Sequence, residues 1–126
     1  MVMPARVYVA DSSKQQELKK LVEYDPYLDS SMKEEDLKHI REDASANVIF
    51  ARQDYQIKEG ASLSLNRDKI YLYISASEDF LERADKKLKA VIAGIERADP
   101  ETEKKIISSI EDERKKAENG FGYIFG

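Results

Sequence analysis

The sequence contains no cysteine, one histidine and only five glycines among its 126 residues. Without cysteine there is no disulfide, thiolate nucleophile, zinc ribbon or iron–sulfur cluster. A single histidine leaves nucleophilic and acid–base catalysis short of the partner groups that they need. Three of the glycines lie within residues 120–126, so the remaining two cannot form a P-loop or a dinucleotide-binding loop. We therefore identify no catalytic residue and expect no metal and no cofactor.

The remaining polar clusters have simpler explanations than a catalytic or metal site. His39 stands in a highly charged segment, where a surface histidine is the favoured interpretation. The acidic run 34–36 lacks the alternating oxygen ligands and central glycine of an EF-hand, which favours solvated helix charge. Asp54 and Glu59 resemble a hydrolase carboxylate pair, but a chain with 25 acidic residues contains such pairs by chance.

The composition is that of one soluble domain with a strongly charged surface. Hydrophobic residues make up 41% and charged residues 37% of the chain, and the net charge is −4. We expect a single domain over residues 1–126. The first residues lack the apolar stretch of a signal peptide, and no apolar run has the length of a membrane span, which favours a cytoplasmic protein.

The first third of the chain predicts one strand and two helices. Residues 6–10 have the β-branched and aromatic bias of a strand. Two capping-box patterns follow, Ser12 with Gln15 and Ser31 with Glu34, and they predict helices over residues 13–24 and 31–42. Asp25–Pro26 separates the two helices, because the residue before a proline is pushed out of the helical region.

The middle of the chain predicts an antiparallel meander of three strands. Residues 44–57 fit a strand by residue type and a helix by apolar spacing, and we favour the strand. Turns at 58–60 and 66–68 then enclose a short strand over residues 61–65. The clearest strand of the sequence covers residues 69–76, where aliphatic residues alternate with tyrosine and serine.

Two helices are predicted after the sheet. The first is capped by Ser75 or Ser77 and keeps one apolar face as far as Ile95, which places Gly94 inside it. The second begins at Asp99–Pro100 and buries its first half through isoleucines. Residues 111–118 are predicted to be a solvated extension that ends at Asn119–Gly120. The element order β-α-α-β-β-β-α-α predicts a two-layer α+β fold, a mostly antiparallel sheet of three or four strands with helices packed on its aliphatic face.

The first candidate binding surface is the tyrosine face of this sheet. Tyr71 and Tyr73 share one face of their strand, Arg67 and Lys69 flank them, and Tyr8 on a neighbouring strand is a further candidate. Aromatic rings among basic residues on an open sheet can stack the bases of single-stranded nucleic acid. The favoured alternative is that a helix or another protein covers the rings.

The second candidate surface is the C-terminal tail, residues 119–126. It contains Phe121, Tyr123 and Phe125, three of the eleven aromatic residues of the chain. Such a tail can dock on its own domain as an edge strand or plug, pair with a second copy, or insert into a partner. The sequence leaves open whether it docks in cis or in trans.

These features favour a small non-enzymatic binding or regulatory module that acts through self-association or a protein partner. Nucleic-acid binding through the tyrosine face is the first alternative, disfavoured by the net negative charge. The second is a small-ligand pocket or enzyme site between sheet and helices, which requires a concave apolar cavity with converging polar groups.

Overall fold

The computed structural model describes residues 3–43 and 48–125, with side chains up to Glu118. Its four strands form one antiparallel sheet of order β2-β3-β1-β4. They are β1 (Ala5–Asp11), β2 (Asp54–Glu59), β3 (Lys69–Ser75) and β4 (Glu96–Arg97). The predicted α+β class with a four-stranded antiparallel sheet is confirmed.

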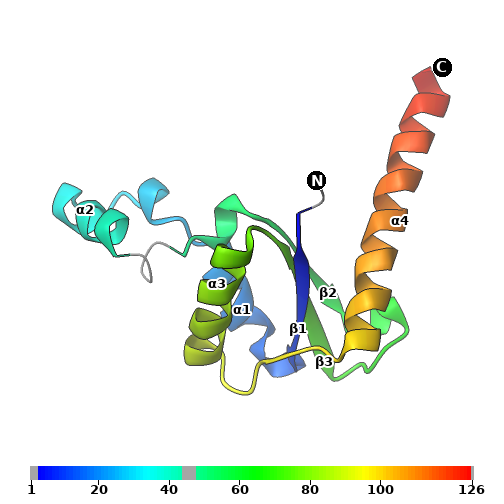
Figure 1. Cartoon of the computed structure of the whole chain (residues 1–126), viewed down its shortest axis with the longest axis horizontal. Helices are drawn as coiled ribbons and strands as arrows, with labels where there is room; N and C mark the ends of the chain where they lie inside the picture. Colours follow the sequence, from blue (N-terminus) through cyan, green and yellow to red (C-terminus); the bar gives the residue numbers. More distant parts are fainter. Residues whose placement is uncertain (1–2, 44–47, 126) are drawn as a thin grey trace.

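The helices lie on both faces of the sheet. They are α1 (Gln15–Glu23), α2 (Glu34–Glu42), α3 (Glu78–Val91) and α4 (Pro100–Phe125). Figure 1 shows α1 and α3 on one face, α4 on the other, and α2 set apart from the sheet on the side away from α4. The predicted packing of helices on the aliphatic face holds for α1 and α3, and α4 adds a third layer that the two-layer description did not include.

Each sheet face has its own hydrophobic core. The α1/α3 side buries the aliphatic residues of β3, including Leu72, together with Tyr8. The α4 side buries Val7, Tyr71 and Tyr73. Strand register explains the division, because Tyr8 pairs with Leu72 while Val7 pairs with Tyr73, and residues directly opposite each other project from the same face. Tyr8 therefore does not share the face of the two β3 tyrosines.

The buried Tyr8 hydroxyl gives a prediction for alkaline pH. It donates a 2.8 Å hydrogen bond to Asp85 Oδ1, and burial raises the pKa of Tyr8 from 10.0 to about 12. The unfolded chain loses this proton first as pH rises, so the free energy of unfolding falls between pH 10 and about 12. In a phenolate absorbance titration, Tyr8→Phe is expected to remove a late step near pH 12.

Tyr71 supplies the control for this titration, because burial also raises its pKa. Tyr71→Phe is expected to leave the step near pH 12 in place. If that step survives in Tyr8→Phe instead, the assignment to Tyr8 is wrong.

The strand predicted over residues 61–65 is wrong. These residues belong to a 3₁₀ turn, Gly60–Leu63, and the loop after it, so β2 and β3 form a hairpin with a long connection. The Leu65 N–H donates to the Gly60 carbonyl at 2.8 Å. A Cβ on Gly60 would lie 1.7 Å from the Asn66 carbonyl oxygen, so only glycine permits this close return of the backbone.

The strand predicted over residues 44–57 is present only in its second part. Residues 44–47 lie outside the described residues. Phe50–Arg52 is a short 3₁₀ helix, and β2 begins at Asp54. Phe50 is buried and packs edge-to-face on Phe80 of α3, with ring centroids 5.9 Å apart. Tertiary packing of this ring replaces the strand that the residue types favoured.

Two predicted capping boxes are also wrong, because aspartates bond to the serine segments as turns that precede α1 and α2. Asp11 accepts a 2.9 Å hydrogen bond from the Ser13 N–H, so Ser12 is not the cap. Asp29 accepts bonds from the N–H and hydroxyl of Ser31, and α2 begins three residues later. An aspartate side chain satisfies the free N–H groups of a turn as well as serine does.

The chain after α3 differs from the predicted long helix. The helix is capped by Ser77, whose Oγ accepts the Phe80 N–H, and it ends at Val91. Gly94 lies outside it with a φ of +79°, a conformation that glycine adopts without strain. This turn leads into β4, which no local pattern predicted and which pairs with Tyr8 and Val9 of β1.

Candidate interaction surface on α4

The first half of α4 is anchored on the sheet. Asp99 caps it by accepting the Thr102 N–H at 3.0 Å, which confirms the predicted start. Glu103 accepts the Val7 N–H of β1 at 3.0 Å. Ile106 and Ile110 are fully buried against the tyrosine face. These contacts fix the helix against β1 and β3.

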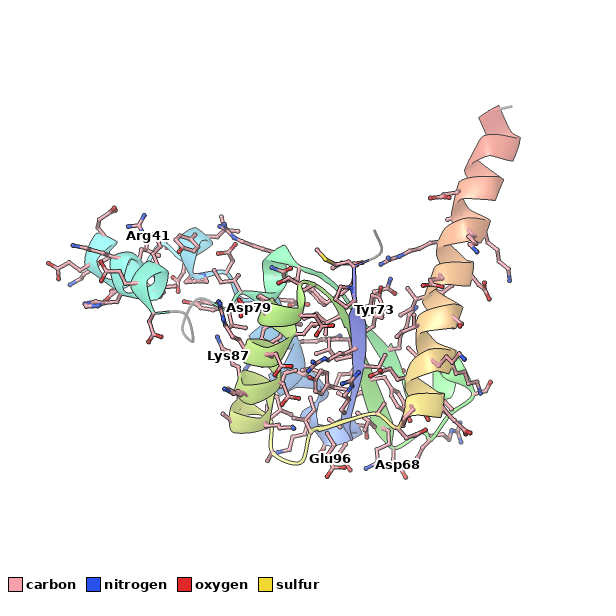
Figure 2. The ribbon with its side chains drawn as sticks, in the orientation of Figure 1. Arg41, Asp68, Tyr73, Asp79, Lys87 and Glu96 are labelled. Atoms are coloured by element: carbon pink, nitrogen blue, oxygen red, sulfur yellow. The ribbon has the colours of Figure 1, made fainter. Side chains whose placement is uncertain are left out.

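This half of α4 covers the predicted tyrosine face. Tyr71 and Tyr73 are 6% and 5% exposed, and Figure 2 shows Tyr73 between the sheet and the helix. A base needs an open ring face on which to stack. The structure therefore leaves the nucleic-acid hypothesis without its stacking platform, and the helix cover favoured as its alternative is present.

Of the basic residues expected beside the tyrosines, Lys69 shares the strand face of Tyr71 two residues away, whereas Arg67 precedes the strand. Arg67 is exposed in the turn before β3, and Lys69 is half-buried at the start of that strand. Figure 2 shows Asp68, between these two residues in the chain, toward the opposite end of the sheet from Tyr73. Since Tyr8 faces the other core, the structure does not bring the five candidates together on one surface.

The second half of α4 projects beyond the sheet. Every residue from Glu111 to Glu118 is exposed, which confirms the predicted solvated extension. The predicted stop at Asn119–Gly120 is wrong, because the helix continues to Phe125. Figure 1 shows the C-terminal end of α4 far from the sheet. We call residues 111–125 the α4 extension.

Residues 119–125 of the tail are therefore part of a helix. Its backbone does not form the edge strand that was considered for docking in cis. The side chains of Phe121, Tyr123 and Phe125 lie outside the described side chains. A glycine inside a helix costs only about 1 kcal/mol, so the two glycines at 120 and 122 do not suffice to end it.

Two ion pairs join the base of the α4 extension to the edge strand β2. Arg114 donates to both carboxylate oxygens of Asp54, at 3.0 and 2.7 Å, and this bond raises the pKa of Arg114. Its guanidinium carbon lies 5.7 Å from the centre of the Tyr73 ring. Lys58 Nζ lies 3.1 Å from Glu113 Oε2. A bidentate pair fixes orientation, so these contacts set the direction in which the extension leaves the sheet.

A surface groove of about 430 Å³ lies beside the base of the α4 extension. Its apolar lining includes Met3, Ala5 and Ile107, and its charged lining includes Glu111 and Arg114. Met3 is 58% exposed, which is high for a methionine in a folded domain. We call this hollow the α4 groove.

The free charges of the α4 extension lie next to this groove. Glu111 lines it, and Lys115 lies one helical turn further along the same side of the helix. Both side chains are exposed, and neither forms an ion pair with another residue whose side chain the structure describes. They are therefore available to charges on a second molecule.

The interior of the described chain is apolar. Apart from tyrosines, no residue with a polar or charged side chain is buried in the described ranges, and the space between the sheet and α1/α3 is filled by side chains of the hydrophobic core. No three potential metal ligands cluster in the part of the chain that the structure covers. His39 is exposed on α2. The cavity required by the ligand-pocket hypothesis is not found at this position.

A second hollow, of about 410 Å³, opens beside the start of α3. Arg52 and Arg83 contribute to its lining. Each guanidinium already has a carboxylate partner, Asp25 for Arg52 at 2.8 Å and Asp79 for Arg83. Neither arginine is left unpaired for an anionic ligand.

No protein family, no curated protein and no solved structure matches this chain. The surface must therefore be interpreted from its own chemistry. None of the described helices is both long and apolar enough to cross a membrane.

The sequence contained a signal for this surface, the helical spacing of apolar residues along α4. The predicted helix end at Asn119–Gly120 prevented its recognition. The spacing that matters is counted from Ile107. Phe121 follows it by 14 residues and Phe125 by 18, close to four and five turns of an α-helix. They share one side of a continuous α4. Contacts of the extension with Asp54 and Lys58 had no sequence signal, because they depend on where the helix crosses β2.

Proposed function

We propose that this protein is a non-enzymatic binding module that acts by self-association through the α4 extension. The observation that carries the proposal is the exposure of residues 111–118 on a helix that continues to Phe125. Most helical stability in proteins comes from packing of an apolar face, and residues 111–118 form about two turns that lack such packing. A second molecule that packs on the extension supplies the missing stabilisation.

The charge balance of the extension favours a protein surface over nucleic acid as its partner. Residues 111–118 carry four acidic side chains, at 111, 112, 113 and 118, and three basic ones, at 114, 115 and 116. A phosphate backbone requires a basic surface, whereas a mixed surface of this kind complements another mixed surface. A second copy presents such a surface at the same concentration.

The proposal predicts a dimer whose formation depends on the aromatic end of α4. In size-exclusion chromatography with light scattering, the full chain at tens of micromolar is expected at about twice its mass of 14.4 kDa. Phe121→Glu combined with Phe125→Glu is expected to give a monomer, because burying unpaired charge at an interface is strongly unfavourable.

Leu28→Glu is the matched control. Leu28 is 82% exposed and lies outside α4, so the same type of substitution there is expected to leave the dimer intact. Circular dichroism must show an unchanged fold in both variants. A monomeric full chain, or a dimer that persists in the Phe121/Phe125 variant, contradicts the proposal.

A further inference from the structure

We infer that the α4 groove holds the α4 extension of a second copy of this chain, so that two α4 helices pair antiparallel about a two-fold axis. This inference rests on the self-association proposed above and specifies its partner surface. It follows from the size of the groove, the reach of α4 and the order of charges along the helix.

The groove is large enough for aromatic side chains. A cavity of about 150 Å³ in a protein core accommodates one benzene molecule. The α4 groove has about 430 Å³ and an apolar lining that includes Met3, Ala5 and Ile107. It therefore has room for more than one phenylalanine ring.

The phenylalanines of the same copy cannot occupy the groove. A helix rises about 1.5 Å per residue, so Phe121 lies about 21 Å along α4 from Ile107. Because α4 is a continuous helix from Pro100 to Phe125, its end does not return to its own base. An aromatic residue of this tail reaches an α4 groove only on another copy.

The charges beside the groove select an antiparallel arrangement. Glu111 and Lys115 lie one turn apart on one side of α4. In a parallel pair each residue faces the identical residue of the partner, so that glutamate lies opposite glutamate and lysine opposite lysine. In an antiparallel pair centred near Glu113, each Glu111 faces the partner's Lys115, and the two-fold axis produces this contact twice.

The same register brings the aromatic tail to the groove. With the axis near Glu113, Ile107 lies about 9 Å from it on one side and Phe121 about 12 Å from it on the other. In an antiparallel pair, Phe121 of one copy and Ile107 of the other therefore lie at similar positions along the direction of the two helices. The contact is reciprocal, so it forms a closed dimer and leaves no free end for further association.

Cysteine cross-linking tests the arrangement directly, because the natural chain has no cysteine. Met3→Cys places a thiol in the groove, and Glu118→Cys places one on the extension one turn before Phe121. Each variant carries one cysteine, and a size tag on one of them identifies mixed dimers. With a short bismaleimide, the mixed product is expected several-fold above the control pair.

The control pair combines Glu118→Cys with Leu28→Cys. Leu28 is highly exposed, and Figure 1 shows its segment, Pro26–Leu28, on the side of the sheet away from α4. If light scattering shows a dimer and the Met3 and Leu28 pairs give equal yields, the groove inference is wrong and self-association stands. A monomeric full chain overturns both.

Discussion

Replacing Ile110 by alanine is expected to lower the free energy of unfolding by about 2–5 kcal/mol. Ile110 is 0% exposed and, among the α4 side chains described up to Glu118, is the last that is buried. Its side chain covers the tyrosine face together with Ile106. The substitution removes apolar contacts and leaves a cavity beside Tyr71 and Tyr73, because neighbouring side chains relax only partly.

Urea denaturation followed by circular dichroism measures this loss. The midpoint is expected to fall while the dependence on urea concentration stays the same, since the surface exposed on unfolding is unchanged. Protein concentration must be equal in all samples, because dimer formation adds to apparent stability.

Val91→Ala is the control for Ile110→Ala. Val91 also ends the packed part of a helix, but it is 50% exposed, so its truncation is expected to change stability by no more than about 0.5 kcal/mol. Equal losses in the two variants contradict the placement of α4 as a layer of the core. A loss below about 1 kcal/mol for Ile110→Ala contradicts it as well.

The elements that the sequence predicted well are those with a complete local signal. β3 has a strict alternation of Ile70, Leu72 and Ile74 with tyrosines, and the structure gives it two buried faces. The start of α4 has an aspartate cap followed by proline, and Asp99 does cap the helix. Such signals depend only on neighbouring residues, so they do not require knowledge of the tertiary fold.

The elements that were missed depend on residues far apart in the chain. β4 has two residues and exists because β1 offers the backbone of Tyr8 and Val9 as a partner. The 60–68 loop is shaped by the contact of Gly60 with Asn66, although its residue types also suit a strand. Residue type alone does not distinguish these outcomes.

The candidate site was predicted only in part. The aromatic tail and the solvated second half of the last helix were both visible in the sequence, but the helix stop at Asn119–Gly120 separated them. The glycines at positions 120 and 122 weaken a helix without ending it, and α4 continues past both of them to Phe125. The α4 groove had no signal, because its walls come from the N-terminus, the sheet and α4.

Reversing one charge on the groove side of α4 is expected to weaken the dimer, and reversing two is expected to restore it. Glu111→Lys places lysine opposite lysine at both symmetric contacts, and Lys115→Glu places glutamate opposite glutamate. Exposed pairs contribute about 0.2–1 kcal/mol each, and like charges cost a similar amount. The dissociation constant is therefore expected to rise about 10- to 100-fold in each single variant.

The double variant, Glu111→Lys with Lys115→Glu, restores opposite charges across an antiparallel pair and is expected to return the dissociation constant close to that of the natural chain. Sedimentation equilibrium measures the three constants. The differences are expected to shrink at high salt, because exposed charges are screened. Two weakened single variants with a restored double variant, together with unaffected controls of the same spacing at positions 112 and 116, show that position 111 of one copy lies near position 115 of the other.

The control exploits the 100° step between successive helix residues. Asp112→Lys and Lys116→Glu make the same charge changes one position further along, on the side of α4 away from the groove. They are expected to leave the dissociation constant within about threefold, because net charge alone acts weakly at these distances. If they weaken the dimer as much as Glu111→Lys and Lys115→Glu do, the effect comes from net charge and the antiparallel pairing loses its support.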